Sequence, residues 1–311
     1  MRDRKNTTVE IAILGVLGAF ALLCLAAPQL LRDREPRQLL SVSVLLRDTD
    51  SSGWTVARQG MEQAADELGA ELRFLTLASY SDSGEQNELL LREIDGGAEG
   101  LVVVPADAAA LRDALLQRDG ACPVVALESA VEGCAGVVAP DNALLGRCLA
   151  QALLEDWDGG RVLLLEPAPG CAGVVQRLEA AQAALEEAGV PARRAPALPG
   201  EGLDGGWVLA FDPSSTQQAA EWKAAEQRAF ALYGVGSSTA ITAHLEQGTI
   251  AAIAAWSDYA AGYLAVRQVV ESTRGAEEEL APLAFSILRK EDIYAPENQK
   301  LLFPIMSSSG R

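Results

Sequence analysis

Histidine is almost absent from this sequence, and basic residues are scarce. The 311 residues include one histidine, His244, and five cysteines without Cys-x-x-Cys spacing. These are too few soft ligands for an ordinary zinc centre, so we expect no metal, and nothing points to another cofactor. Lysine and arginine total 25 against 43 aspartates and glutamates, a formal net charge of −18. A duplex nucleic acid needs a basic protein face and is excluded as partner of the globular part.

Catalytic constellations are missing as well. No histidine lies near Cys171 in sequence to activate its thiol, and no nucleophile–base pair is visible. We therefore expect a protein that binds and is not an enzyme.

Apolar residues are plentiful, and one run lies at the amino end. Residues 11–27 carry no charge and follow Arg2, Arg4 and Lys5. At about 1.5 Å per residue this run approaches the thickness of a bilayer core. We favour an uncleaved signal anchor, with a cleaved signal peptide and a buried core helix as alternatives. The polar residues 30–38 form a linker, so residues 1–38 are anchor and linker and the body begins at Leu39.

The body begins with a strand, a loop and a helix. Residues 42–46 are an apolar run, a polar loop leads to Trp54, and apolar positions at helical spacing continue to the stop signal Gly69. A strand with little alternation indicates burial on both faces, as in a parallel sheet, and such sheets bind ligands at their carboxyl edge. The loop at residues 47–54 lies at that edge.

Strands and helices then alternate along the whole body. The expected strands are 42–46, 71–77, 100–104, 123–127, 136–138, 161–165, 207–211, 230–233 and 250–254, with helices between most of them. This alternation predicts a doubly wound parallel sheet, and its restart near residue 142 predicts a second, similar lobe.

Several segments carry a family likeness in the expected order. They are GMEQAADELG at 60–69, EGLVVVPAD at 99–107, PVVALES at 123–129, APDNALLG at 139–146 and EQGTIAAIA at 246–254. In these segments the chain resembles the type I periplasmic sugar-binding proteins, the ribose- and galactose-binding receptors of ABC importers.

The resemblance implies two lobes joined by three crossovers, near residues 140–141, 256–257 and 284–285. Lobe one would comprise 39–140 plus 257–284, and lobe two 141–256 plus 285–311. Ligand would lie between them.

The same resemblance implies a set of ligand-binding residues. Trp54 falls where the family stacks an aromatic ring on a sugar, and Glu128 where an Asp accepts sugar hydroxyls. Asp212 matches a polar residue at a strand end, and Trp256 occupies the hinge position. Structural alternatives stay open: a core role for Trp54, a solvated carboxylate at Glu128, a helix cap at Asp212 and hinge packing at Trp256. The full candidate set is Trp54, Asp50, Ser51, Glu128, Asp212 and Trp256.

Departures from the family pattern bear on the ligand and on lobe two. The family's sugar-clamping Arg aligns with Val175 and a late Asp with Gly236, so we expect a ligand less rich in hydroxyls than a hexose.

Residues 189–207 show no helical pattern where the family has a crossover helix. That face of the sheet must be covered by a loop or leave an apolar patch for a partner.

Two cysteines precede neighbouring predicted strands. If those strands pair in parallel, Cys122 and Cys134 come within disulfide reach, and an exported protein would meet the oxidising compartment that the bond needs.

Two functions remain open. The first is a membrane-anchored, extracytoplasmic receptor that closes on a small polar, possibly sugar-like ligand for an ABC permease. The second is a sensor or scaffold of the same fold, which docks a membrane partner such as a histidine kinase and binds ligand weakly or not at all.

Overall fold

Strands form where the sequence has short apolar runs rich in valine and leucine. In the computed structural model, β3 (Gly100–Val103) and β4 (Val124–Leu127) are buried along their whole length. The structure describes residues 39–49, 52–117, 122–166, 170–200, 202–276 and 280–302. The predicted anchor at residues 11–27 lies outside them. No helix within these ranges is long and apolar enough to cross a membrane.

The first sheet is entirely parallel. Its order is β2-β1-β3-β4-β5, with β1 at Leu40–Leu45, β2 at Ala70–Leu75 and β5 at Gly136–Val138. Val44 of β1 pairs with Phe74 of β2 on one side and Val102 of β3 on the other. All carboxyl ends of these strands therefore meet at one edge.

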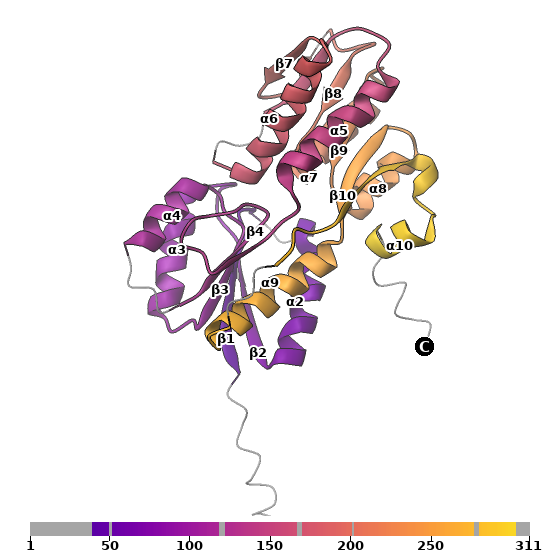
Figure 1. Cartoon of the computed structure of the whole chain (residues 1–311). Coiled ribbons are helices and arrows are strands. Elements are labelled where there is room, and N and C mark those ends of the chain that lie inside the picture. Colours follow the sequence, from indigo (N-terminus) through magenta and orange to yellow (C-terminus); the bar gives the residue numbers. More distant parts are fainter. Residues whose placement is uncertain are drawn as a thin grey trace, which may run out of the picture. The chain divides into compact units, whose positions relative to one another are not determined.

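The second sheet has the order β11-β10-β9-β8-β6-β7. Its strands are β6 (Val162–Leu165), β7 (Ala192–Ala195), β8 (Trp207–Leu209), β9 (Ala231–Val235), β10 (Ala252–Trp256) and β11 (Phe285–Arg289). Only the β10–β11 pair in this sheet is antiparallel. The expected α/β architecture with two parallel-sheet lobes is confirmed (Figure 1).

Helices cover both sheets. They are α2 (Thr55–Leu68), α3 (Ser83–Asp95), α4 (Ala108–Leu116), α5 (Asn142–Asp156), α6 (Ala172–Glu187), α7 (Pro213–Ala225), α8 (Thr239–Glu246), α9 (Asp258–Thr273) and α10 (Pro296–Leu302), with short 3₁₀ turns η1 (Ser52–Trp54) and η2 (Lys290–Asp292). Alternating strand residues serve opposite cores: Leu101 and Val103 pack with Leu90 and Leu111 of α3 and α4, whereas Val102 packs in the core on the other face.

The chain passes between the two sheets three times. It leaves the first sheet after β5 and enters α5, which packs against β9, β10 and β11. It returns after β10 to α9, which packs on β3, β4 and β5, and crosses again to β11. Pro140 and Leu283 form an isolated β-bridge, so two of the crossing segments run side by side.

Two glycines let α2 and α9 approach closely. A Cβ on Gly60 would lie 2.0 Å from the carbonyl oxygen of Tyr259, and one on Gly262 would lie 1.9 Å from that of Ala57. Side chains at either position would force the helices apart. This contact fixes the amino ends of α2 and α9 beside one another, and both ends lie at the site described below.

The face of the second sheet that lacks a crossover helix is covered by residues of the loop between β7 and β8. Between the edge strand β7 and β8 the described residues form no helix. Leu203 is buried in one cluster with Leu163 and Leu165 of β6, and Leu198 packs beside them. Of the two outcomes expected for this face, the loop cover is the one observed.

The expected Cys122–Cys134 disulfide is not present. Val125 of β4 pairs with Gly136 of β5, which places Cys134 opposite Pro123 and one residue out of step with Cys122. The two cysteines are not bonded to one another, and the Cys122 thiol donates to the carbonyl oxygen of Ala98 at 3.2 Å. Burial raises the pKa of the Cys134 thiol to about 12, which disfavours the thiolate needed for oxidation.

Candidate functional site

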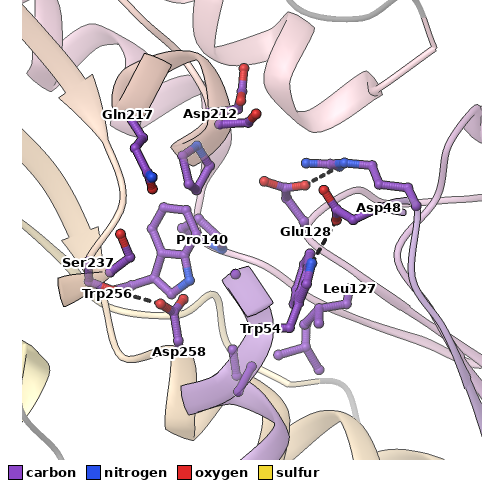
Figure 2. A pocket seen from close by; sticks show the side chains of 18 of the residues that line it. Asp48, Trp54, Leu127, Glu128, Pro140, Asp212, Gln217, Ser237, Trp256 and Asp258 are labelled. Carbon is purple, nitrogen blue, oxygen red and sulfur yellow. Dashed lines mark hydrogen bonds and ion pairs between the residues drawn. The ribbon is translucent and has the colours of Figure 1, made fainter. Parts of the chain in front are cut away.

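A pocket of about 350 Å³ lies where the carboxyl ends of strands from both sheets meet (Figure 2). Its walls come from the segments that follow β1, β4, β8, β9 and β10, and from the bridged crossing residues Pro140 and Leu283. This is the edge at which parallel sheets bind ligands, and the volume suits a small molecule.

Two tryptophans line this pocket from different elements. Trp54 is the residue before α2, and its ring is partly buried while its Nε1 donates to Asp48 Oδ2 at 2.7 Å. Trp256 ends β10 and is buried, with the guanidinium of Arg177 5.0 Å from the centre of its ring. Figure 2 shows the two indoles on opposite sides of the labelled Pro140.

A buried carboxylate that lines the same pocket binds two arginines. Glu128, at the end of β4 and 6% exposed, accepts from Arg47 Nη1 through Oε2 and from Arg177 Nη1 through Oε1 at 3.3 Å. Arg47 follows β1 and is 4% exposed, and Arg177 of α6 is fully buried. The cluster therefore joins both lobes at the floor of the pocket.

Arg177 has further partners in the second lobe. Its Nε donates to Asn142 Oδ1 at 2.7 Å, and its Nη1 donates to the carbonyl oxygen of Phe211 at 3.0 Å. Asn142 Nδ2 in turn donates to the carbonyl oxygen of Glu128 at 2.9 Å. Glu128 has φ +73, a backbone conformation that costs a non-glycine residue about 1 kcal/mol or more and persists only where neighbours enforce it.

The cluster sets the charge states of its members. Burial alone would raise the pKa of Glu128, but the charges and hydrogen bonds of Arg47 and Arg177 outweigh it and hold that pKa below its ordinary value. Burial opposes the charge on Arg47, yet attraction to Glu128 leaves the Arg47 pKa above its ordinary value. All three groups are charged, so the cluster has a net charge of +1. The ring of Trp256 faces the guanidinium of Arg177.

Asp212 is a helix cap as well as a lining residue. It precedes α7, and its carboxylate accepts from the backbone N–H of Ser215 at 2.9 Å and from the Ser215 hydroxyl at 2.7 Å. The sequence left open whether Asp212 binds ligand or caps the helix, and the structure shows the cap. A role in binding stays a prediction.

Asp258 lines the pocket from the first turn of α9. It is partly buried, and its carboxylate accepts from the Ser237 hydroxyl at 2.7 Å (Figure 2). Burial raises the pKa of Asp258 to about 6, the Ser237 hydrogen bond opposes this shift, and the charge of Glu128 adds to it. Ser257, not Asp258, caps the helix by accepting from the backbone N–H of Ala260.

The structure brings together four of the residues predicted from the sequence. Trp54, Glu128, Asp212 and Trp256 all line this pocket, whereas Asp50 and Ser51 lie outside the described residues. That these six residues bind a ligand stays a prediction.

Sequence reasoning missed Arg47, Arg177, Asp48 and Asp258. A Ser-Asp pair at a helix start is an ordinary capping signal, so nothing local marked Asp258.

Chemistry other than binding has little support here. Within the described ranges no cluster of histidine, cysteine, aspartate or glutamate could hold a metal ion. The Cys171 thiol is buried, and this burial raises its pKa, which disfavours a nucleophile.

A polar and aromatic pocket between two parallel-sheet lobes defines a protein built to hold a small solute. The family model of the periplasmic binding protein domain matches residues 42–201, and the chain belongs to this family. The family consists of solute receptors without enzymatic activity, so the expectation that the chain is not an enzyme is confirmed by membership.

Solved structures share the fold along most of the chain. An ABC transporter solute-binding protein from Agrobacterium vitis with bound D-fucose is 16% identical, with 85% of this chain and 100% of that chain covered and a TM-score of 0.76. The myo-inositol binding protein of Caulobacter, bound to myo-inositol, is 18% identical, with 84% and 99% covered and a TM-score of 0.71. These likenesses show the type I periplasmic-binding fold.

A third similar structure is a complex. A chain of the XylFII–LytSN complex is 15% identical, with 82% of this chain and 99% of that chain covered and a TM-score of 0.69. No curated protein sequence matches this chain.

Removal of the Glu128 charge tests the ion cluster. Glu128→Gln leaves two buried guanidinium groups without their anion, so we expect the free energy of unfolding to fall by about 3–5 kcal/mol. The matched control is Glu187→Gln, which breaks an exposed pair with Arg147 and should cost less than about 1 kcal/mol. Urea denaturation measures both. Equal stability of the two variants would contradict the structural role of Glu128.

Removal of the Asp258 charge should increase the free energy of unfolding, in contrast to removal of the Glu128 charge. Because the folded-state pKa is raised to about 6, the proton stabilises the fold at low pH, and this contribution is lost as the pH rises through that value. Asp258→Asn should therefore raise the free energy of unfolding at pH 7 by about 1–2 kcal/mol, with the gain vanishing near pH 4.

The control for this change is Asp66→Asn, on the exposed face of α2, which removes the same charge without burial. Urea titrations at pH 7 and pH 4 measure all three proteins. An Asp258→Asn protein less stable than the parent at pH 7 would show that the carboxylate supports the fold.

Proposed function

We propose that the chain is an extracytoplasmic solute receptor, held at the membrane by residues 11–27, which closes two lobes on a small polar ligand and delivers it to an ABC importer. The observation that carries the proposal is the pocket, because aromatic and polar groups from both lobes converge there. Similar solute-binding proteins of known structure hold D-fucose and myo-inositol, which supports a ligand of sugar or polyol size.

Closure would use the three crossing segments. Pro140 and Leu283, which pair with one another, and Trp256 all lie in the pocket wall, so small backbone rotations there change the separation of the walls. A ligand that contacts Trp54 in the first lobe and the Ser237–Ser238 loop in the second stabilises only the arrangement in which both are near it.

A sensor or scaffold is the alternative, and the similarity to a chain of the XylFII–LytSN complex favours it. In that case the chain would dock a membrane partner such as a histidine kinase. Leu198 and Leu203 weaken one version of this idea, because they cover the apolar face that a partner could have used. Ligand affinity separates the two functions.

Trp54 provides the first test. Thermal-shift screening of the full chain in detergent against sugars, polyols, nucleosides and amino acids should identify a ligand, since saturation at 100 times Kd adds about 2.7 kcal/mol. Trp54→Ala should then weaken that ligand by about 1–3 kcal/mol and leave a folded protein, because the ring is only partly buried. Calorimetric titration measures the loss.

Trp54→Phe is the matched control, since it keeps a smaller aromatic face while it removes the hydrogen bond to Asp48. It should retain most of the affinity. Unfolding of Trp54→Ala, or unchanged affinity, would make Trp54 a core residue and would remove the receptor function's best residue.

Topology provides the second test. A reporter that is active only outside the cytoplasm, fused after Arg311, should be active, because the basic start and residues 11–27 direct export. Deletion of residues 2–27 should abolish this activity. Signal from a cytoplasm-specific reporter at the same position, without exported activity, would refute the proposed location.

A further inference from the structure

We propose that the ligand of this pocket is a small polyol or sugar-like molecule that carries a protonated amine, and that Asp258 receives this amine. The inference rests on the proposed receptor function and names the chemical class of the ligand. It follows from a comparison of the hydrogen bonds and ion pairs that the charged groups of the pocket already make.

The pocket lining holds more negative than positive side chains. Among the described lining residues, four are carboxylates, Asp48, Glu128, Asp212 and Asp258, and Arg47 is the one basic side chain. Arg47 is bound to Glu128. Even with Arg177 of the same ion cluster counted, the four carboxylates outnumber the two arginines, which argues against an anionic ligand.

Three helix amino ends at the pocket are already capped by side chains of this protein. The α7, α8 and α9 helices begin at the pocket, but the side chains of Asp212, Ser238 and Ser257 accept from their first-turn backbone N–H groups. An anion would have to displace these caps. The attraction of these three amino ends for an anion is thus partly satisfied by the chain itself, whereas α2 also begins at the pocket and has no side-chain cap.

Asp258 has more free acceptor capacity than Glu128 and Asp212. Glu128 binds an arginine with each oxygen, and Asp212 accepts two hydrogen bonds as a helix cap. Asp258 accepts one hydrogen bond, from the Ser237 hydroxyl, within the described residues. An ionised carboxylate has about four lone-pair sites, so Asp258 has room for further donors.

The aromatic side chains suit the same ligand. Trp54, Tyr80 and Trp256 line the pocket, and indole and phenol faces attract cations as well as the C–H faces of rings. In Figure 2 the Asp258 carboxylate lies just below the Trp256 indole, and Trp54 lies across the view beyond Pro140. An amine at Asp258 would have aromatic surface beside it, and hydroxyl groups could reach Gln217 and Ser238.

The cost of an ionised Asp258 supports the assignment. Burial raises its pKa, and no basic side chain contributes to that shift, so the carboxylate lacks the counter-charge that Glu128 has. A ligand amine would supply it. A neutral hydroxyl could donate a hydrogen bond but would leave the charge uncompensated.

Matched amine and hydroxyl pairs test the proposal on the full chain in detergent. The pairs are D-glucosamine with D-glucose, D-galactosamine with D-galactose, and 2-amino-1,3-propanediol with glycerol; N-acetyl-D-glucosamine keeps the nitrogen without its charge. Calorimetric titration at pH 7.5 should show at least one amine bound about tenfold or more tightly than its neutral partners, the gain of about 1.4 kcal/mol expected for a charge-assisted contact.

Two variants separate the charge from the fold. Asp258→Asn should reduce the amine preference to near unity and remain folded, whereas Asp66→Asn on the surface of α2 should leave the preference unchanged. Added salt should weaken amine binding more than binding of the neutral partner.

The outcomes distinguish this inference from the proposed function. Neutral partners that bind as tightly as the amines, or an amine preference that survives in Asp258→Asn, would overturn the inference and leave the receptor function standing. If neither these pairs nor the broad ligand panel stabilise the full chain, the receptor function itself fails, and the inference fails with it.

Discussion

The buried ion cluster of Arg47, Glu128 and Arg177 is the interaction on which the rest of the site depends. A buried charge without a partner costs several kcal/mol, so each of these groups is stable only if the others are in place. Arg47 and Glu128 follow strands of the first sheet, and Arg177 belongs to α6 beside the second. The ion pair with Glu128 therefore holds α6 against the strand ends of the first sheet. It also positions the guanidinium of Arg177 against the ring of Trp256.

This requirement divides three of the four pocket carboxylates into two groups. Glu128 stabilises the fold through its two arginines, and Asp212 through the cap of α7, so their negative charges are compensated within the chain. Within the part of the chain that the structure describes, the carboxylate of Asp258 accepts a hydrogen bond from the Ser237 hydroxyl alone, and burial raises its pKa and so opposes its ionised form. Natural proteins keep such destabilising groups mainly where function needs them, which is the physical reason to look for the ligand at Asp258.

The sequence was informative wherever the signal was local. Apolar runs such as residues 100–104 predicted buried parallel strands. The family resemblance named Trp54, Glu128, Asp212 and Trp256, and these four residues line one pocket. Pairing was the part that failed. Arg177 is an unremarkable helix residue until the fold brings it to Glu128, and the cysteine prediction failed because the β4–β5 register differs by one residue from the one required.

The position of Asp258 also connects binding to motion. It is the first residue of α9, which packs on the first sheet, and it comes directly after the crossing from β10 of the second. Ser237 follows β9 of the second sheet, so the hydrogen bond from its hydroxyl to Asp258 joins the two lobes beside a crossing segment. A donor group on the ligand at Asp258 would add to this bond only when the Ser237 loop is near. The free energy of this contact would then both increase the affinity for the ligand and favour closure of the lobes.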